Sequence, residues 1–210
     1  IAQDGGGLGA HLQKDGADKP AITAIGACMG AIARAKVHES IAWVEKQNMV
    51  STTYSGAGFG KIAQSLAREL DVAALVDGTL MTDLLSADLD AINRKRYLFL
   101  RKHVGQSGSY WNDSFSADKP ESDYNYIERN RTIDKAVRGI YKALLPHLSG
   151  PVRVDASTGR ISVGTITFLE TLAEDTLVRM EREGELSGFN VIIDPNQSVL
   201  GTSKLAVVVK

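Results

Sequence analysis

The stretch YLFLRKHVGQSGSYWNDSFSADKPESDYNYIERNRTIDKAVRGIYKALLPHL, residues Tyr97–Leu148, decides how this chain folds. It opens with a β-prone run over Tyr97–His103, turns at Ser107-Gly108 and continues into the aromatic run SYWND, which together predict a β-hairpin. The following SADKPESD is polar and holds a proline, so it predicts a loop. A long helix begins near Asn125. This order of elements indicates a module that assembles with other subunits rather than one that performs chemistry.

The helix that begins near Asn125 is amphipathic. Apolar residues recur at intervals of three and four along one face, which is predicted to be buried. They are Ile133, Val137, Ile140, Tyr141, Leu144 and Leu148. The other face carries a line of basic side chains: Arg131, Lys135, Arg138 and Lys142. Pro146 is expected to end or bend the helix, because its ring clashes with the preceding turn and it lacks an amide donor.

Three further elements follow this helix. VRVD and RIS, separated by a turn at Ala156–Gly159, predict a small hairpin. Ser162 is the expected N-cap of a second long helix, which Gly184 ends. FNVIID and KLAVVVK are apolar and β-prone, and they predict a pair of strands joined by PNQSVLG.

The first half of the chain predicts an α/β part. Residues 1–20 are Gly-rich and predict a flexible segment, and the α/β part covers residues 21–96. Gly26 and Gly30, near the start of its first helix, are predicted to permit close packing. Its first helix is expected to end near Asn48 and to carry an apolar stripe formed by Ile25, Met29, Ile32, Ala33, Val37, Ile41 and Val44. The elements expected after it are a strand at Val50–Tyr54, a Gly loop, a helix at Lys61–Leu70, a strand at Val72–Val76 and a helix at Thr82–Asn93.

Together these elements predict the α/β fold class of mixed α+β type. A βα-layered N-terminal part is followed, over residues 97–210, by a C-terminal α+β module in which two long helices pack on a sheet. Because the sequence starts at Ile1 rather than Met and stops inside the apolar run LAVVV, the chain is expected to be a fragment of a longer subunit or trimmed from one.

Composition limits the possible partners. The chain has 210 residues, 43% of them hydrophobic, with 24 Lys and Arg against 25 Asp and Glu, so there is no overall field to attract nucleic acid or an anionic membrane. No apolar run reaches the roughly 18 residues that span a bilayer. A single cysteine, Cys28, excludes internal disulfides and favours a reducing compartment. We expect neither a nucleic-acid nor a membrane partner.

One loop resembles a phosphate-binding motif. Gly56, Gly58, Gly60 and Lys61 follow a predicted strand and precede a predicted helix, the context in which backbone amides bind phosphate. The spacing differs from that of a P-loop, because three residues separate the outer glycines instead of four and Ile62 stands where Ser or Thr would hold magnesium. A nucleotide-binding α/β protein that uses this loop remains an alternative interpretation.

Other residue patterns do not form a catalytic or metal site. His38-Glu39 begins like a zinc-protease helix, but position 42 is alanine where the second imidazole would stand. Cys28 lies on an apolar stripe with nothing nearby to lower its pKa. We therefore expect no enzyme activity, no metal and no cofactor.

Three segments, FLRKHVGQSGSYWNDSF, SDYNYIERNRTIDKAVRGIYKAL and GELSGFNVIIDPNQSVLGTSKLAVVVK, resemble the contractile tail sheath proteins of phages and related contractile injection systems. In that family a hairpin with an aromatic second strand leads through a D-x-x-Y-x-x-x-R segment into a long helix. Asp123, Tyr126, Asn130 and Arg131 align approximately with that segment. The resemblance covers residues 97–210 well and is looser upstream.

The resemblance implies a structural subunit that polymerises helically around a tail tube. Its partners would be copies of itself, joined by strand addition, together with the tail tube protein and baseplate proteins. The subunit would be part of the virion tail sheath, which would be assembled in the host cytoplasm. The candidate edge strand for this exchange comprises Leu205, Val207 and Val209. Either the basic line from Arg131 to Lys142 or the helix over Ser162–Glu183 would face the tube. A non-sheath tail or baseplate adaptor is a further alternative.

Overall fold

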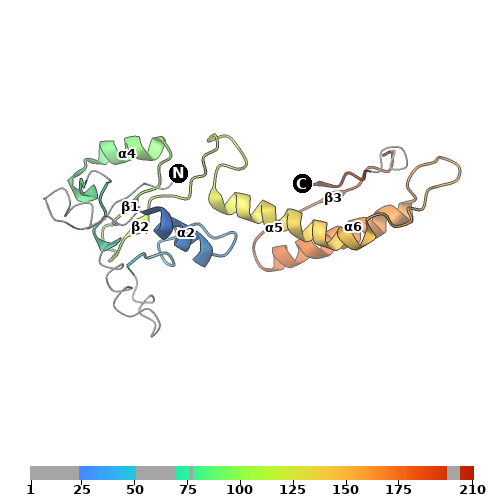
Figure 1. Ribbon diagram of the computed structural model, residues 1–210, viewed down its shortest axis with the longest axis horizontal. Coiled ribbons are helices and arrows are strands. Elements are labelled where there is room, and N and C mark those ends of the chain that lie inside the picture. The colour runs from blue at the N-terminus through green and yellow to red at the C-terminus, as the bar shows by residue number, and fades with distance from the viewer. Residues whose placement is uncertain (1–23, 51–69, 76–77, 198–203) are drawn as a thin grey trace, which may run out of the picture. The chain divides into compact units, whose positions relative to one another are not determined.

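The computed structural model describes residues 24–50, 70–75, 78–197 and 204–210. It divides the chain into two compact units, residues 1–130 and 131–210, each of which is described by itself (Figure 1). The class is mixed α+β, with helices and two small two-stranded antiparallel sheets among the described residues. Predicted elements at Val50–Tyr54 and Lys61–Leu70, with the Gly loop between them, lie almost wholly outside these residues.

Unit 1 contains short elements around one hydrophobic core. In chain order they are α2 (Ala24–Arg34), η2 (Met81–Asp83), α4 (Ser86–Arg94), β1 (Leu100–Arg101) and β2 (Tyr110–Trp111). The predicted helix over Thr82–Asn93 is thus replaced by a 3-10 turn and a shorter α-helix. The predicted strand at Val72–Val76 forms only one isolated bridge in its described part, between Ala74 and Leu80.

The predicted hairpin is confirmed, although its strands are short. Leu100 pairs with Trp111 and Arg101 with Tyr110 in an antiparallel ladder. Asn112 extends the pairing, since its amide donates to the Phe99 carbonyl over 3.0 Å while its side-chain oxygen accepts from the Phe99 amide over 2.9 Å. Leu98, Phe99 and Leu100 are all buried, so the first strand is covered on both faces instead of alternating.

The long helix predicted from Ala21 to Asn48 is wrong in length, because α2 ends at Arg34. The Arg34 guanidinium instead holds the returning chain, donating to Gln47 Oε1 over 2.6 Å and to the Lys46 carbonyl over 3.1 Å. The buried Glu39 carboxylate fixes the turns that lie between Arg34 and Gln47, because it accepts hydrogen bonds from the Lys36 amide and from Lys46 Nζ. These bonds, that to Lys46 above all, hold the pKa of Glu39 below its usual value.

The predicted packing face of α2 also differs. Met29 and Ile25 are exposed, while Cys28 and Ala31 are buried in the core beside Trp111. A Cβ on Gly26 or Gly30 would meet nothing within 4 Å, so the prediction that these glycines permit close packing is wrong. Small side chains, rather than glycines, let α2 approach the hairpin.

Unit 2 contains two long helices and a two-stranded ribbon. Helix α5 (Ile127–Leu144) begins in unit 1 and is followed by η3 (Leu145–His147), α6 (Val163–Arg182), β3 (Val191–Ile192) and β4 (Val208–Val209). The predicted N-cap is confirmed, because Ser162 Oγ accepts from the Thr165 amide over 3.3 Å. The small hairpin predicted before α6 is reduced to one bridge, Val154 to Ile161.

Helix α6 supplies most of the core of unit 2. Its Ala173, Leu177 and Met180 are buried against Val191 of β3, and the Ile166 side chain packs in a second cluster with Ile193. Helix α5 contributes only half-buried side chains to this core. The two long helices and the sheet predicted for this region are therefore present, with α6 making the contact with β3.

The division into units differs from the boundary that the sequence predicts between residues 96 and 97. Phe99 and Trp111 share a core with Cys28 and Ala31, so the hairpin folds with the preceding elements. The structure divides the chain between Asn130 and Arg131. Among the helices that the structure describes, none combines the length and the apolar character needed to cross a membrane.

Candidate assembly surfaces

The four basic residues predicted as a docking line lie on α5, and one of them is engaged within unit 2. Lys135 Nζ lies 2.6 Å from Glu185 Oε2 and 3.3 Å from Glu183 Oε2, in the segment where α6 ends. Glu185 is only 6% exposed, so this ion pair is shielded from solvent on the carboxylate side. The Glu185 carboxylate, followed by that of Glu183, raises the pKa of Lys135 above its usual value. Lys135 therefore ties the two helices together.

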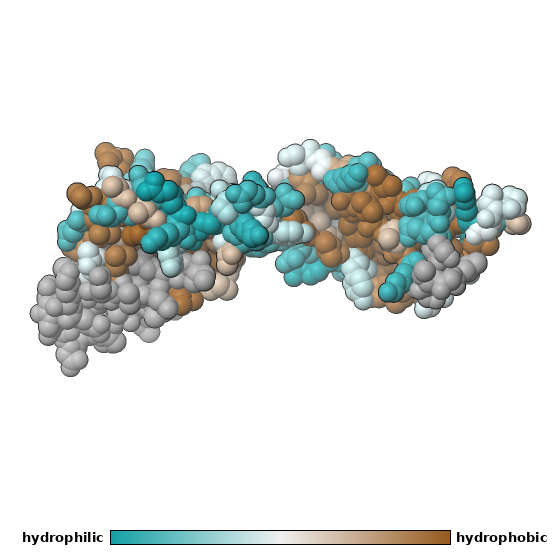
Figure 2. Space-filling view, turned by 90° about the horizontal axis from the view of Figure 1, so that it is seen from above, coloured by the Kyte–Doolittle hydropathy of each residue, from teal (hydrophilic) through white to brown (hydrophobic). Residues whose placement is uncertain are grey.

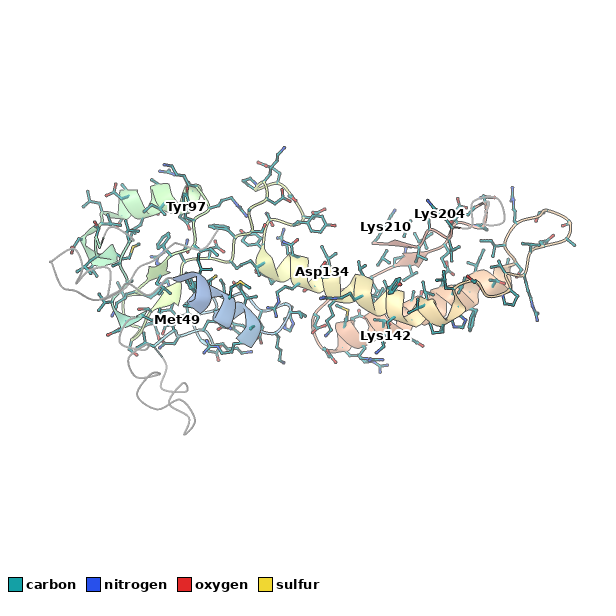
Figure 3. All side chains as sticks on the ribbon, in the orientation of Figure 1. Met49, Tyr97, Asp134, Lys142, Lys204 and Lys210 are labelled. Carbon is teal, nitrogen blue, oxygen red and sulfur yellow. The ribbon has the colours of Figure 1, made fainter. Side chains whose placement is uncertain are left out.

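Arg138 and Lys142 are the exposed part of the line. Arg138 Nε donates to the Asp134 carbonyl of its own helix over 3.1 Å, which leaves the rest of the guanidinium toward solvent. Lys142 is exposed near the end of α5, and Figure 3 labels it and Asp134 on this helix. Neither Arg138 nor Lys142 forms an ion pair with a residue in the described ranges.

The predicted buried face of α5 is wrong in part. Val137, Tyr141 and Leu148 are exposed by 60%, 65% and 73%. Ile140, which belongs to the predicted face, packs toward the α6 core together with Ala136. A signal for this arrangement was present in the sequence, since small residues recur at Ala136, Gly139 and Ala143.

At Gly139, α5 lies close to α6. A Cβ at this position would overlap Thr176 Cγ2. Contacts on either side show that the helices run in opposite directions: Lys135 bonds to Glu183 at the end of α6, and the His147 ring meets Phe168 near its start, with ring centroids 5.1 Å apart. Glycine is thus required by packing, not by backbone conformation.

The β3–β4 ribbon has a defined ladder. Asn190 and Lys210 exchange two backbone hydrogen bonds of 2.8 and 3.0 Å, and Val191 faces Val209. Because bonded and non-bonded pairs alternate in an antiparallel ladder, the Val209 amide and carbonyl point away from β3. The same alternation turns the backbone groups of Val207 outward.

The two edges of the ribbon are not equivalent. On the β3 side, the outward amide of Ile193 donates to Glu170 Oε1 of α6 over 3.0 Å, so this edge is partly covered. On the β4 side, no described residue bonds to the backbone of Val207 or Val209. Two of the three residues predicted to form an exchange edge, Val207 and Val209, therefore have outward backbone groups on an open edge.

The third residue of the predicted edge, Leu205, is held by its neighbour. Gln197 accepts from the Ala206 amide over 2.7 Å and donates to the Ala206 carbonyl over 2.9 Å. The Leu205 and Val207 side chains turn inward and pack, half-buried, on the cluster of Ile161, Ile166 and Ile193. Lys204 and Lys210 stand at the two ends of this extended segment (Figure 3).

The outer face of the ribbon is apolar. Ile192 and Val208 lie opposite each other in the ladder and are both exposed. Figure 2 shows hydrophobic surface over the part of unit 2 that carries β3 and the last strand. A two-stranded ribbon with an apolar outer face is marginal by itself in water, so this surface is suited to burial by a further element.

The chemical groups considered for other functions lie elsewhere. Burial raises the pKa of the Cys28 thiol to about 11, which keeps it protonated and unreactive at neutral pH. The described residues contain no group of three His, Cys, Asp or Glu side chains arranged to hold a metal. The candidate phosphate loop, Gly56, Gly58, Gly60 and Lys61, lies outside the described residues.

Comparison with known proteins gives two family matches and a distant structural likeness. The family model described as "DUF2586, N-terminal domain" matches residues 9–115, and "DUF2586, C-terminal domain" matches residues 123–210. No curated protein matches the chain. A chain in the "Cryo-EM structure of the anti-feeding prophage (AFP) baseplate, 6-fold symmetrised" is similar at 21% identity and a TM-score of 0.49. The match covers 71% of this chain and 44% of that one, so this chain spans less than half of its length.

Proposed function

The chain belongs to the DUF2586 family, and we propose that it is a non-catalytic structural subunit of a contractile tail or contractile injection particle. In its more specific form, the proposal is a sheath subunit that polymerises helically around a tail tube. It binds copies of itself and, through other surfaces, the tail tube and baseplate proteins. It works without a cofactor, in a particle that is assembled in the host cytoplasm.

The open edge of β4 carries this proposal. Val207 and Val209 turn backbone donors and acceptors outward, and a strand from a neighbouring subunit can pair with them. The apolar outer face at Ile192 and Val208 adds area that a neighbour would bury. Since the added strand comes from another copy through a different surface, the contact is heterologous and repeats from subunit to subunit.

The sequence resemblance supports the particle class. The aromatic hairpin, the segment from Asp123 to Arg131, the long helix α5 and the last strand pair occur in the order typical of contractile sheath proteins. In this interpretation the exposed Arg138 and Lys142 are the part of the basic line that can meet the tube, because Lys135 is already paired with Glu185.

A baseplate or adaptor position is the second candidate, and the same edge favours it. A heterologous contact closes into a ring when its rotation allows and otherwise continues as a helix. The subunit edge is compatible with either outcome.

The test uses a backbone change confined to the outward edge. Val209→Pro removes the outward amide and leaves the β3–β4 ladder bonds in place, since that amide does not donate to β3. We expect the full chain with V209P, produced together with the other proteins of its particle, to keep the wild-type unfolding transition and to be missing from assembled particles in electron micrographs. Assembly of V209P at the wild-type level would overturn the proposal.

Two matched variants complete this test. Val209→Ala trims the side chain and keeps the amide, so it should assemble, whereas Val208→Pro removes an amide inside the ladder and should lower the stability of the subunit itself. In the same micrographs, a continuous layer along the tube indicates a sheath and a single ring at its end indicates a baseplate or adaptor.

The nucleotide-binding alternative is tested separately by calorimetric titration with ATP, GTP and NAD. Heat released by nucleotide binding at Gly56–Lys61 would be lost in the Lys61→Ala variant.

A further inference from the structure

Helix α5 presents a second apolar surface that the β4 edge does not involve. Val137, Tyr141, Leu145 and Leu148 are all exposed and run from α5 through η3 at spacings of four, four and three. We call these four residues the α5 stripe. It extends over about three helical turns, or roughly 17 Å, and the core of unit 2 lies against a different face of the helix, at Ala136 and Ile140.

The spacing of the α5 stripe fits another helix. Apolar residues that recur at three and four form a ridge that inserts between the side chains of a helix with the same repeat. Tyr141 at the middle of the stripe supplies the kind of large, partly polar side chain that is enriched at the centre of protein interfaces.

The charges beside the α5 stripe determine which helix would fit. Asp134, Arg138 and Lys142 follow one border at steps of four, so the border carries a net positive charge along the length of the stripe. Two carboxylates that follow α6, Glu183 and Glu185, are occupied by Lys135. Arg138 and Lys142 have no carboxylate partner among the residues of the described part.

A second copy of the same surface is a poor occupant. If two stripes paired in opposite directions with Val137 against Leu148, Lys142 would lie near Lys142 of the other copy. Like charges that face each other across an interface are destabilising. In this register the border disfavours self-pairing, and its exposed cations favour carboxylates.

We infer that the α5 stripe is a docking surface for an amphipathic helix of a different protein, with apolar residues at three and four and acidic residues along one border. The apolar residues of that helix bury Val137, Tyr141, Leu145 and Leu148, and its carboxylates pair with Arg138 and Lys142. This surface is independent of strand addition at β4, so it can be tested without an assembled particle.

The experiment uses two synthetic amphipathic helices with the same leucine seam. One carries glutamate along its border and the other carries lysine, and each is labelled with fluorescein. In anisotropy titrations the full chain should bind the glutamate peptide at least about tenfold more tightly than the lysine peptide, because only the former complements Arg138 and Lys142. Equal binding of both peptides, or no binding of the glutamate peptide, would overturn the inference.

Variants of exposed residues locate the binding surface. Val137→Ser with Tyr141→Ser should weaken binding of the glutamate peptide about tenfold or more, whereas Val104→Ser, at an exposed valine of unit 1, should leave it unchanged. Arg138→Glu with Lys142→Glu should reverse the preference toward the lysine peptide. Concentration-dependent self-association of the chain that Y141S abolishes would instead identify a second copy as the occupant and would contradict the inference.

Discussion

At the scale of single residues, one line of cations on α5 serves two purposes. Lys135 and Lys142 lie on the same helical face and are the same residue type, yet Lys135 bridges to the buried Glu185 and Lys142 faces solvent. Sequence periodicity predicts that the basic residues share a face, and it does so correctly. It does not reveal that a carboxylate some fifty positions away reaches one of them, because that contact depends on how α6 returns along α5.

Replacing the engaged lysine should cost stability, and replacing the exposed one should not. Lys135→Met leaves the Glu185 carboxylate buried without its cation, and we expect the free energy of unfolding to fall by about 1–2 kcal/mol, since Lys135 itself is 39% exposed and partly screened. Lys142→Met should stay within about 0.5 kcal/mol of the wild type. Urea unfolding followed by circular dichroism measures both values.

The pH dependence of this difference follows from the raised pKa of Lys135. A cation whose pKa is higher in the folded state stabilises the fold fully below the unfolded value of 10.5, and the contribution disappears as pH rises through the folded value. The difference between K135M and K142M should therefore be constant from neutral pH to about pH 10 and shrink above it. A loss of equal size in both variants would contradict this role of Lys135.

At the scale of elements, the approach of α5 to α6 depends on one glycine. Alanine at position 139 would gain about 1 kcal/mol in helix propensity, but its Cβ would overlap Thr176 Cγ2. Forcing a methyl group into a packed contact costs about 1–3 kcal/mol, so we expect Gly139→Ala to be destabilising overall by up to about 2 kcal/mol. Thermal and urea unfolding of the full chain would measure the change.

Two companion variants separate packing from helix propensity. Thr176→Ser removes the methyl group that the new Cβ meets, so G139A with T176S should recover most of the lost stability. Gly164→Ala, in α6 with nothing within 4 Å of the added Cβ, should be neutral or stabilising by up to about 1 kcal/mol. If G139A alone raised the stability, the two helices would be able to move apart without a loss of stability.

The elements themselves were largely predictable, whereas their faces and lengths were less so. The three- and four-residue spacing gives α5 and α6, Ser162 gives the cap of α6, and Ser107-Gly108 gives the hairpin. The apolar stripe of α5 was assigned to the core because periodicity detects an apolar face without showing which face is covered. Local patterns do not predict that α2 ends at Arg34. The chain turns back there because Glu39 and Arg34 bind Lys46 and Gln47, and no local pattern connects these residues.

At the scale of the whole molecule, both units have a buried core, but α5 stands out as a long helix that is only half-buried. The largest fully buried residues include Trp111, Phe99 and Ile41 in unit 1 and Leu177 and Met180 of α6 in unit 2, whereas α5 has no fully buried residue among those described. The candidate surfaces for assembly, the β4 edge and the α5 stripe, both belong to unit 2. The sequence indicated such a role for this region, but it could not distinguish apolar residues that complete the core from those that await a partner.

Hydrogen exchange should display the open edge directly. In the isolated chain, the outward amides of Val207 and Val209 should exchange rapidly, whereas those of Val208 and Lys210, which point into the ladder, should exchange more slowly. After assembly all four should be protected. Amide exchange resolved by NMR measures the alternation, and uniform protection in the isolated chain would show that the edge is already covered.

The side chain of Gln197 has a consequence for the length of this edge. Its side-chain amide donates to the Ala206 carbonyl and accepts from the Ala206 amide, as a backbone peptide of β3 would. Gln197 thus takes the place of a β3 residue at a point where β3 has already ended. Gln197 holds the chain at Ala206, and β3 holds it at Val208 and Val209. Together these contacts lengthen the edge that a partner strand can pair with from two residues to five, Leu205 to Val209. That is about the length of an ordinary β-strand, so one glutamine makes the edge long enough to be recognised as a partner strand.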